Sequence, residues 1–257
     1  MQWLMMNLIG GLASFGGAAP GGIRDTEREA SRSALLGLCA AALGIRRDEV
    51  GRQQALSREL KFAVRVDSAA QLLRDYHTAQ APVESAMKGR PRQTRKDELS
   101  VAKDDLNTVL SDRYYYANYV ATVGIHSEND DTLLELADAL RKPKFVLYLG
   151  RKSCPLAWPL APMHVQADDW LAALAHFDGL QAERRQSHRL GPSRNVWAAV
   201  EDRWFAGKIF QHAIDKSLPV GALLGDCRWH TRWDDPLDTQ RRLYAPREHQ
   251  RAQEHRS

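Results

Sequence analysis

The chain has 257 residues, enough for one large domain or two small ones with a hydrophobic core. Its formal net charge is only +4, so the total charge does not by itself indicate a nucleic-acid-binding protein. The three cysteines, Cys39, Cys154 and Cys227, lie far apart without a CxxC pair. This spacing supports neither a zinc site nor a disulfide framework, so we expect reduced thiols, no metal and no cofactor.

The apolar N-terminus, residues 1–17, lacks the positively charged start of a signal peptide. Asn7 and the Gly10–Gly11 pair also interrupt it. No later run approaches the roughly 18 apolar residues that a membrane helix needs. These features predict a soluble, cytoplasmic protein with no membrane contact.

The first elements are predicted from apolar runs and from the residues that end them. Residues 2–9 form a short apolar run that Gly10 closes, which favours a buried strand. Residues 33–43 are rich in alanine and leucine and are predicted to be helical. Ser31 or Ser33 can cap the start of this helix, and Gly44 stands where a C-cap glycine belongs.

The next elements repeat this order around a long insert. Residues 60–66 alternate as a strand does, and residues 114–125 are aromatic and β-branched, which also favours a strand. Residues 132–140 have leucines at helical spacing, with Asp131 or Thr132 as the cap. Residues 144–149 are predicted to form a further strand, central in the sheet, which Gly150 ends.

The resulting order, β-α-β-insert-β-α-β, is that of a split βαβ, or ferredoxin-like, fold, which the RNA-recognition domain shares. We therefore predict an α+β protein with an RRM-like domain over residues 1–150. Residues 151–257 are predicted to form a smaller, β-rich lobe with a basic tail, including strands at 163–167 and 195–201 and a helix at 168–177.

The insert, residues 67–113, is too long for a simple turn, and loops of this length are usually functional or disordered. Within it, residues 88–103 contain six basic and two acidic residues, a local net charge of +4. Such a stretch can form a projecting basic hairpin that neutralises phosphates, or it can be a solvated charged loop. The candidate phosphate contacts are Lys88, Arg90, Arg92, Arg95 and Lys96.

The loop after the predicted strand 144–149 has the sequence LGRKS. Gly150 permits a close backbone approach that a Cβ would block. Free backbone N–H groups together with Arg151, Lys152 and Ser153 suit a phosphate group. The alternative is an ordinary β-turn with two basic residues.

Four segments of the sequence are distinctive in their order and spacing: SALLGLCAAALGI (33–45), FAVRVD (62–67) leading to LRDYHT (73–78), RYYYANYVATVGI (113–125) and KPKFVLYLGRKSCPL (142–156). Together they resemble the CasD family, the type I-E branch of the fifth Cas protein family within the repeat-associated RNA-binding (RAMP) proteins. The resemblance spans roughly residues 4–180, and after residue 181 only RRLYAPRE (241–248) resembles the usual end.

The resemblance implies a non-catalytic subunit of the Cascade complex that holds the 5′ handle of the CRISPR RNA. It implies a thumb formed by residues 67–113 and a glycine-rich loop at residues 149–153 that contacts RNA. The implied partners are the CRISPR RNA, a large CasA-type subunit, a CasC-type backbone subunit and, through the assembled complex, target DNA. The residues expected to contact RNA are Ser33, Arg74, Tyr76, His77, Lys88, Arg90, Arg92, Arg95, Lys96, Arg113, Gly150, Arg151, Lys152 and Ser153.

Two other functions remain open from the residues. His77 could deprotonate a ribose 2′-OH while Lys96 or Arg95 stabilises the developing charge, which would make the chain a metal-independent endoribonuclease. A lone histidine without a positioned partner is weak support for that reaction. Alternatively, the chain could be a protein-interaction domain whose basic insert is merely solvated.

The tyrosines from Tyr114 to Tyr119 could stack on bases, although alternate ones must face opposite sides of a strand.

Overall fold

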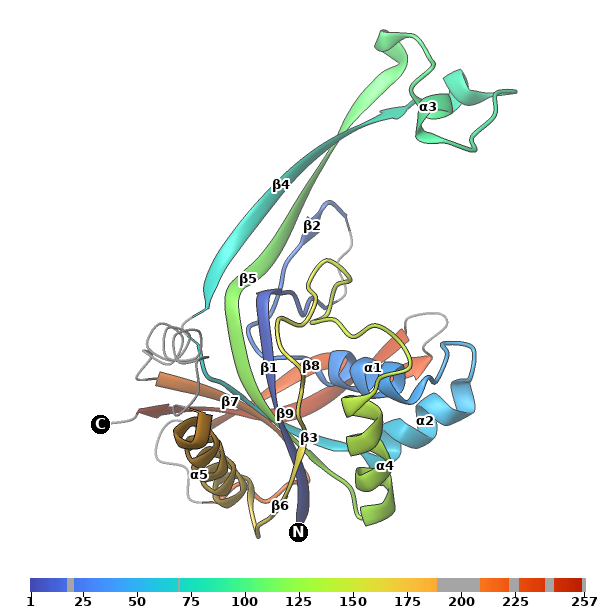
Figure 1. Cartoon of the computed structure of the whole chain (residues 1–257). Coiled ribbons are helices and arrows are strands. Elements are labelled where there is room, and N and C mark those ends of the chain that lie inside the picture. The colour runs from blue at the N-terminus through green and yellow to red at the C-terminus, as the bar shows by residue number, and fades with distance from the viewer. Residues whose placement is uncertain (18–20, 69, 189–208, 222–226, 239–242, 256–257) are drawn as a thin grey trace.

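In the computed structural model, the described part of the chain covers residues 1–17, 21–68, 70–188, 209–221, 227–238 and 243–255, and its strands join in one sheet (Figure 1). The helices are α1 (Arg32–Leu43), α2 (Val50–Glu59), α3 (Arg95–Glu98), α4 (Asp130–Arg141) and α5 (Trp170–His188), with 3₁₀ turns η1 (Glu84–Met87) and η2 (Lys103–Asp105). The strands are β1 (Gln2–Ala13), β2 (Ile23–Arg24), β3 (Lys61–Val66), β4 (Gln71–Pro82), β5 (Leu106–His126), β6 (Met163–Gln166), β7 (Ile209–Asp215), β8 (Cys227–Asp238) and β9 (Leu243–His255).

The main sheet has the order β6-β1-β5-β3-β7-β9-β8, and β2 and β4 pair with β5 outside this path. Within β6-β1-β5-β3, every neighbouring pair is antiparallel. Strand β7 pairs with the free edge of β3, so strands from both halves of the chain share the sheet. The division at residue 150 therefore stays a prediction.

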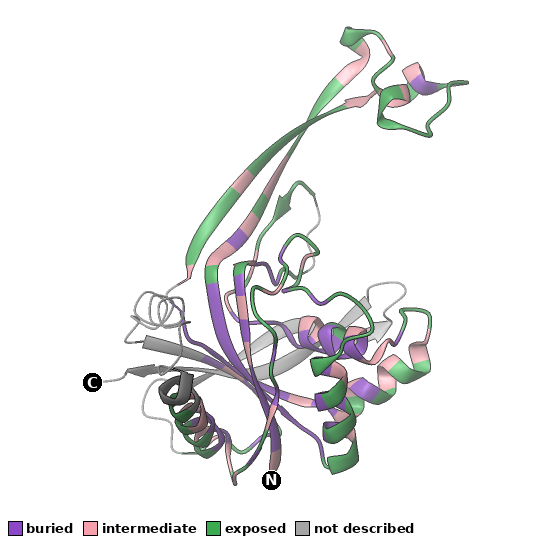
Figure 2. Cartoon of the chain, viewed as in Figure 1, coloured by how far each residue is buried: buried purple, intermediate pink, exposed green. Residues whose placement is uncertain are grey.

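Alternation along β1 divides the core into two layers. Leu4, Met6 and Leu8 belong to the cluster that includes residues of α1 and α4. Trp3 and Met5 instead belong to the cluster with Trp170 and other residues of α5. Side chains alternate across a strand, so the two sets lie on opposite faces of the sheet. Figure 2 shows the buried strands passing between these helices.

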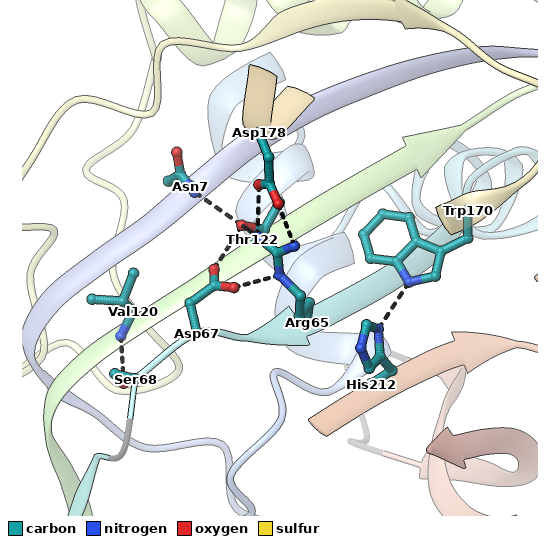
Figure 3. A network of polar contacts seen from close by, with 9 residues as sticks. All are labelled: Asn7, Arg65, Asp67, Ser68, Val120, Thr122, Trp170, Asp178 and His212. Carbon is teal, nitrogen blue, oxygen red and sulfur yellow. Dashed lines mark hydrogen bonds and ion pairs between the residues drawn. The ribbon is translucent and has the colours of Figure 1, made fainter. Parts of the chain in front are cut away.

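A buried polar network fastens α5 to its face of the sheet (Figure 3). The Arg65 guanidinium donates to Asp67 at 2.5 Å and to both carboxylate oxygens of Asp178 at 2.8 Å. Thr122 donates to the second oxygen of Asp67 at 2.6 Å and accepts from Asn7 at 3.0 Å. Burial raises the pKa of Asp67, although Arg65 and Thr122 oppose this shift.

The two predicted helices of the first domain are confirmed. Helix α1 begins after Ser31, whose side chain accepts from the Ala34 amide at 3.2 Å, and ends at Gly44 with φ 74°. Helix α4 begins after Asn129, not at the predicted cap, because the Asn129 side chain accepts from the Asp131 amide. Helix α2 was not predicted: it is mostly polar, and Leu56 is its one buried residue.

The predicted strand at residues 144–149 is wrong. The Lys144 and Phe145 amides donate to the last carbonyls of α1, and Tyr148 forms only an isolated bridge with Pro155. The amides of Lys144 and Phe145 are already used by carbonyls of α1, so they cannot also donate to a neighbouring strand. Pro143, just before them, has no amide hydrogen to donate. Strand β6 matches the strand predicted at 163–167. It pairs with β1 at the edge of the main sheet, whereas the prediction assigned it to a second lobe. The predicted strand 195–201 lies outside the described residues.

The insert forms a projecting two-stranded hairpin, as one alternative predicted (Figure 1). Strand β5 begins at Leu106, before the predicted start at residue 114, and pairs with β4 up to Ala117. From Ala121 onward it pairs with β3. Between these pairings, Asn118 has φ 55°, a left-handed conformation that asparagine tolerates better than most residues, where the ribbon leaves the sheet.

Candidate nucleic-acid interface

Arg151 joins the glycine loop to the root of the hairpin. Its guanidinium carbon lies 5.0 Å from the centre of the Tyr115 ring. The same group donates to the carbonyls of Tyr114 at 3.4 Å and Arg24 at 3.1 Å. Tyr115 is buried, so it orients Arg151 and is not available to stack on a base. These contacts join the loop to the hairpin root.

The reason for glycine at position 150 is packing against β1. Its φ is 83°, and a Cβ built there would lie 1.8 Å from the carbonyl oxygen of Ser14. The Ser14 amide donates to the Leu149 carbonyl at 3.1 Å, which holds the two segments together. The sequence suggested that Gly150 lacks a side chain so that a phosphate can approach. In the structure, the contact with Ser14 is by itself enough to require glycine at this position.

Strand β2 adds an arginine that the sequence argument missed. It pairs in parallel with β5, so that Arg24 is the register partner of Arg113, which in turn lies opposite Asp75 on β4. The Arg151 contact to the Arg24 carbonyl completes the group. We call Arg24, Arg113 and Arg151 the root cluster. Only a two-residue strand places Arg24 there, and no periodicity in the sequence marks so short a strand.

The predicted contacts on the hairpin divide between its two faces. Directly opposite residues of antiparallel strands share a face, and so do residues two apart. By register, His77, Asp75 and Arg113 lie on the face of Tyr115, which Arg151 covers. Arg74 and Tyr76 lie on the other face. The structure therefore brings His77, Arg113 and Arg151 to one side and separates them from Arg74 and Tyr76.

On that other face, Arg74 is committed to an ion pair. It donates through Nε and Nη2 to the two carboxylate oxygens of Asp112, each at 2.9 Å. The hydrogen bond to Asp112 raises the pKa of Arg74, so the guanidinium stays charged. The guanidinium carbon of Arg74 lies 5.9 Å from the centre of the Tyr76 ring, and Tyr76 is 55% exposed. Tyr76 is thus the hairpin tyrosine that solvent reaches most readily and that can stack on a base.

His77 has the partner that the sequence argument found missing. Its Nε2 lies 2.5 Å from Oδ2 of Asp75, two residues earlier on the same face. Of the two proposed charge stabilisers, Lys96 and Arg95, Arg95 is held elsewhere, since it donates to Glu98 and to the carbonyl of Gln80. Gln80 is three residues from His77 along β4, which corresponds to about 10 Å. The structure therefore supplies an Asp–His pair without Arg95 beside it.

The tip of the hairpin is less basic than the stretch 88–103. The folded tip, residues 83–105, contains six basic and five acidic residues, a net charge of +1. Arg92 pairs with Glu84 at 3.3 Å and Arg95 pairs with Glu98 at 2.6 Å. Arg90 donates to the carbonyl of Ser100 at 3.2 Å. Lys88 and Lys96 are exposed, which makes them the better candidates at the tip for phosphate contacts.

The remaining predicted residues lie at the edges of this region. Lys152 and Ser153 are exposed in the turn after Gly150. Ser33 lies half-buried in the first turn of α1, where its hydroxyl is 3.2 Å from that of Ser31. Among the predicted tyrosines, Tyr119 is fully buried and packs edge-on against Phe15. Tyr115 and Tyr119 therefore pack within the protein and cannot both serve as stacking surfaces for bases.

Within the described ranges, no group of three or more histidine, cysteine, aspartate or glutamate side chains is placed to hold a metal ion. In the same part of the chain, every helix is too short or too polar to cross a bilayer. Cys39 and Cys154 are buried and free, and burial raises the pKa of Cys39 to about 12. These thiols pack as small apolar groups.

A protein-family model for the CRISPR-associated Cas5 proteins matches residues 3–208. The chain belongs to the CRISPR-associated Cas5 family. This Cas5 chain is 34% identical over 187 residues to the CRISPR system Cascade subunit CasD of Escherichia coli (strain K12), a match that covers 69% of this chain and 77% of the relative. The family assignment made from the four sequence segments is thereby confirmed.

Two solved structures are similar to this Cas5 chain over nearly its whole length. A chain of a CRISPR RNA-guided surveillance complex has a TM-score of 0.57 and 26% sequence identity, over 98% of this chain and 90% of that chain. The structure described as "Crystal structure of Cas protein" has a TM-score of 0.55 and 23% identity, over 98% of this chain and 95% of that chain. The second likeness bears on the fold alone.

Proposed function

We propose that this Cas5 chain is a non-catalytic CRISPR-RNA-binding subunit of a type I-E Cascade complex, in which it holds the 5′ handle and closes one end of the backbone. The observation that carries the proposal is the root cluster. There, three arginines from three separate segments meet where the hairpin leaves the sheet. Contacts with Tyr114, Tyr115 and the Arg24 carbonyl hold the Arg151 guanidinium, and Arg24 and Arg113 are exposed at paired positions of β2 and β5. Guanidinium groups gathered in this way suit the phosphates of a single RNA strand.

We propose that the domain is ferredoxin-like, of the RRM and RAMP kind, with the hairpin as its thumb. The strand order β6-β1-β5-β3 supports this, because β1 and β3 flank the antiparallel β5 and α1 lies in the connection from β1 to β3. Helix α4 lies in the connection from β5 to β6. Two such β-α-β units joined through the hairpin make the split βαβ pattern.

Within this proposal the RNA passes along the face of the hairpin that holds Arg113 and His77, against the loop of Arg151, Lys152 and Ser153. Tyr76 on the opposite face, with Lys88 and Lys96 at the tip, serves the parts of the RNA that continue around the thumb. Ser33, Arg74, Arg90, Arg92, Arg95 and Gly150 support this surface through their contacts within the protein. Backbone and phosphate contacts of this kind position RNA without reading its sequence.

Protein partners are also proposed: a large CasA-type subunit and a CasC-type backbone subunit, with target DNA reached through the assembled complex in the cytoplasm. Support comes from the hairpin, which is exposed on both faces beyond the sheet (Figure 2). A two-stranded hairpin alone is marginally stable in water. It also exposes large apolar side chains, which mark contact surfaces when they gather. These are Leu72, Leu73, Tyr76, Val109 and Leu110.

One observation favours a second candidate, a metal-independent endoribonuclease. The Asp75 carboxylate can orient His77 for proton transfer, as in other acid–base sites. His77 is exposed beside the proposed RNA path, so it can reach a ribose hydroxyl. The non-catalytic function is preferred because Arg95, one of the two expected charge stabilisers, donates to Glu98 and to the Gln80 carbonyl, which leaves Arg113, opposite Asp75, as the cation on the face of the pair.

The test is co-purification of RNA with the full chain, expressed together with a CRISPR array and the other Cascade subunits. A high ratio of absorbance at 260 nm to that at 280 nm and recovery of RNA beginning with the repeat-derived handle would support the proposal. Recovery of the assembled protein without RNA bound to this chain would favour a pure protein-interaction domain instead.

A further inference from the structure

We propose that the groove along the connection from α4 to β6 docks an acidic segment of another protein subunit, which inserts an apolar side chain. We call this the connection groove. Its volume is about 690 Å³, and its walls include Leu140, Val146, Leu156 and the prolines Pro143, Pro155 and Pro159. This volume lies in the range of clefts that bind partner groups. The inference rests on the proposed function only in that the partner is a subunit of the same complex.

The walls of the connection groove are held in place before any partner arrives. Arg141 donates to the Pro162 carbonyl at 3.0 Å, which closes the two ends of the connection. The Ala157 amide donates to the Ile9 carbonyl on β1 at 2.8 Å. Prolines add fixed backbone angles. A groove that is already formed loses little conformational freedom on binding, which favours affinity.

Large apolar side chains stand exposed around the groove although the connection is anchored. Val146 is 82% exposed, and Phe145 and Trp158 are each 43% exposed. Their neighbours Leu147 and Leu160 are buried, so the connection does have a core side to which apolar residues turn. Gathered exposed apolar groups mark contact sites, and tryptophan is enriched among the residues that dominate binding energy.

The positive charge around the groove favours an acidic partner segment. Residues 139–167 contain five basic residues and no aspartate or glutamate. Two of them, Lys142 and Lys144, adjoin the exposed Phe145 and Val146, whereas Arg141 is paired with Asp138 at 2.9 Å. The stem of Lys144 lies against Gly44, where a Cβ would come within 2.5 Å of Lys144 Cδ, so this side chain is partly fixed. Acidic residues flanking an apolar anchor complement such a rim.

Two other occupants fit less well. A second copy of this chain, bound about a twofold axis, would bring the same basic segment against itself, and like charges repel. RNA would meet walls of aliphatic carbon and proline, which offer few hydrogen-bond donors to phosphates or bases. A protein segment with an apolar anchor uses both the walls and the charged rim.

The test places a photo-crosslinking amino acid at position 146 of the full chain in the RNA-loaded complex reconstituted from purified subunits. We expect an adduct on another protein subunit, within a segment whose apolar residue is flanked by aspartate or glutamate. An adduct on RNA, an adduct on a second copy of this chain, or no adduct would each overturn the proposal.

Two variants allow the contribution of the groove to subunit binding to be measured. Val146→Asp should weaken the binding of the crosslinked subunit at least tenfold, because it buries a charge in the groove, while RNA retention is unchanged. Leu134→Asp is the matched control, since Leu134 is 54% exposed on α4 outside the groove lining. Equal binding by both variants would overturn the proposal. Loss of RNA from the wild-type complex would instead count against the proposed function.

Discussion

Gly150 lies so close to Ser14 that a Cβ would stand 1.8 Å from the Ser14 carbonyl oxygen, and its φ of 83° disfavours any other residue. We expect Gly150→Ala to lower the free energy of unfolding by at least about 2 kcal/mol, from the strained backbone and the collision. Chemical denaturation of the full chain measures this change.

Gly37 provides the control, because it is exposed within α1 and nothing lies within 4 Å of the Cβ that alanine would add. Gly37→Ala should raise the free energy of unfolding by about 0.5–1 kcal/mol, the usual gain in a helix. If both variants shift stability alike, Gly150 is not held by the Ser14 contact.

Arg65→Met removes the cation that links Asp67 and Asp178. It should cost about 3–5 kcal/mol of stability at neutral pH, because Asp67 then stays buried without its charged partner. The pKa of Asp67, already raised by burial, should rise further in this variant. The folded state then binds a proton at a higher pH than the unfolded state, so the variant gains stability as pH falls toward the unfolded pKa.

The measurement is the free energy of unfolding of wild type and Arg65→Met from neutral to mildly acidic pH. The difference between the two proteins should shrink as pH falls. The double variant Arg65→Met, Asp67→Leu should recover part of the loss at neutral pH, since it leaves no buried unpaired carboxylate there. A pH-independent difference would contradict the network account.

At the tip of the hairpin, Lys88 and Lys96 should contribute more to RNA binding than the paired Arg92 and Arg95. Lys88→Gln with Lys96→Gln should reduce the salt slope of RNA binding by about 1.4, or about 0.7 for each phosphate contact on a single strand. Arg92→Gln with Arg95→Gln removes equal charge and should change the slope less. Titrations at several salt concentrations compare the two pairs, and the reverse ranking would refute the tip assignment.

We expect His77 not to catalyse RNA cleavage. The wild-type chain alone should leave repeat RNA intact over hours with EDTA present, and His77→Ala should not alter RNA processing in the assembled system. The physical reason is that Arg95, one of the two expected charge stabilisers, is held at the Gln80 carbonyl, so that Arg113 opposite Asp75 would have to serve instead. Specific cleavage that is lost in both His77→Ala and Asp75→Asn would establish the ribonuclease instead.

Regular elements with strong local signals could be predicted from the sequence. Helix α1 has both its cap and its terminal glycine in the sequence, and the alternation of residues 60–66 matches β3. The mistaken strand at 144–149 shows the limit of such signals, because its backbone is hydrogen-bonded to the end of α1 and to Ser14 without strand pairing, and Phe145 and Val146 stay exposed. Only tertiary contacts distinguish such an apolar run from a strand.

The candidate site was predictable only in part for the same reason. Gly150 and Arg151 stand in a loop that the sequence singles out. By contrast, Arg24 joins them through a two-residue strand, and Arg92 at the tip pairs with Glu84, which lies outside the basic stretch. Local charge along the sequence therefore overestimated the net charge of the tip and gave no sign of Arg24 beside the predicted Arg113 and Arg151.

The central claim, that the root cluster holds CRISPR RNA, is tested most directly by the affinity of the full chain, in its complex, for handle RNA at two salt concentrations. Arg24→Glu with Arg113→Glu should weaken binding by about tenfold or more and lower the salt slope by at least about 1.4. The control reverses Arg46 and Arg58, two exposed arginines near or on α2, and should bind as wild type does. If the root variant binds handle RNA with wild-type affinity and salt slope, the RNA is not held at the root cluster.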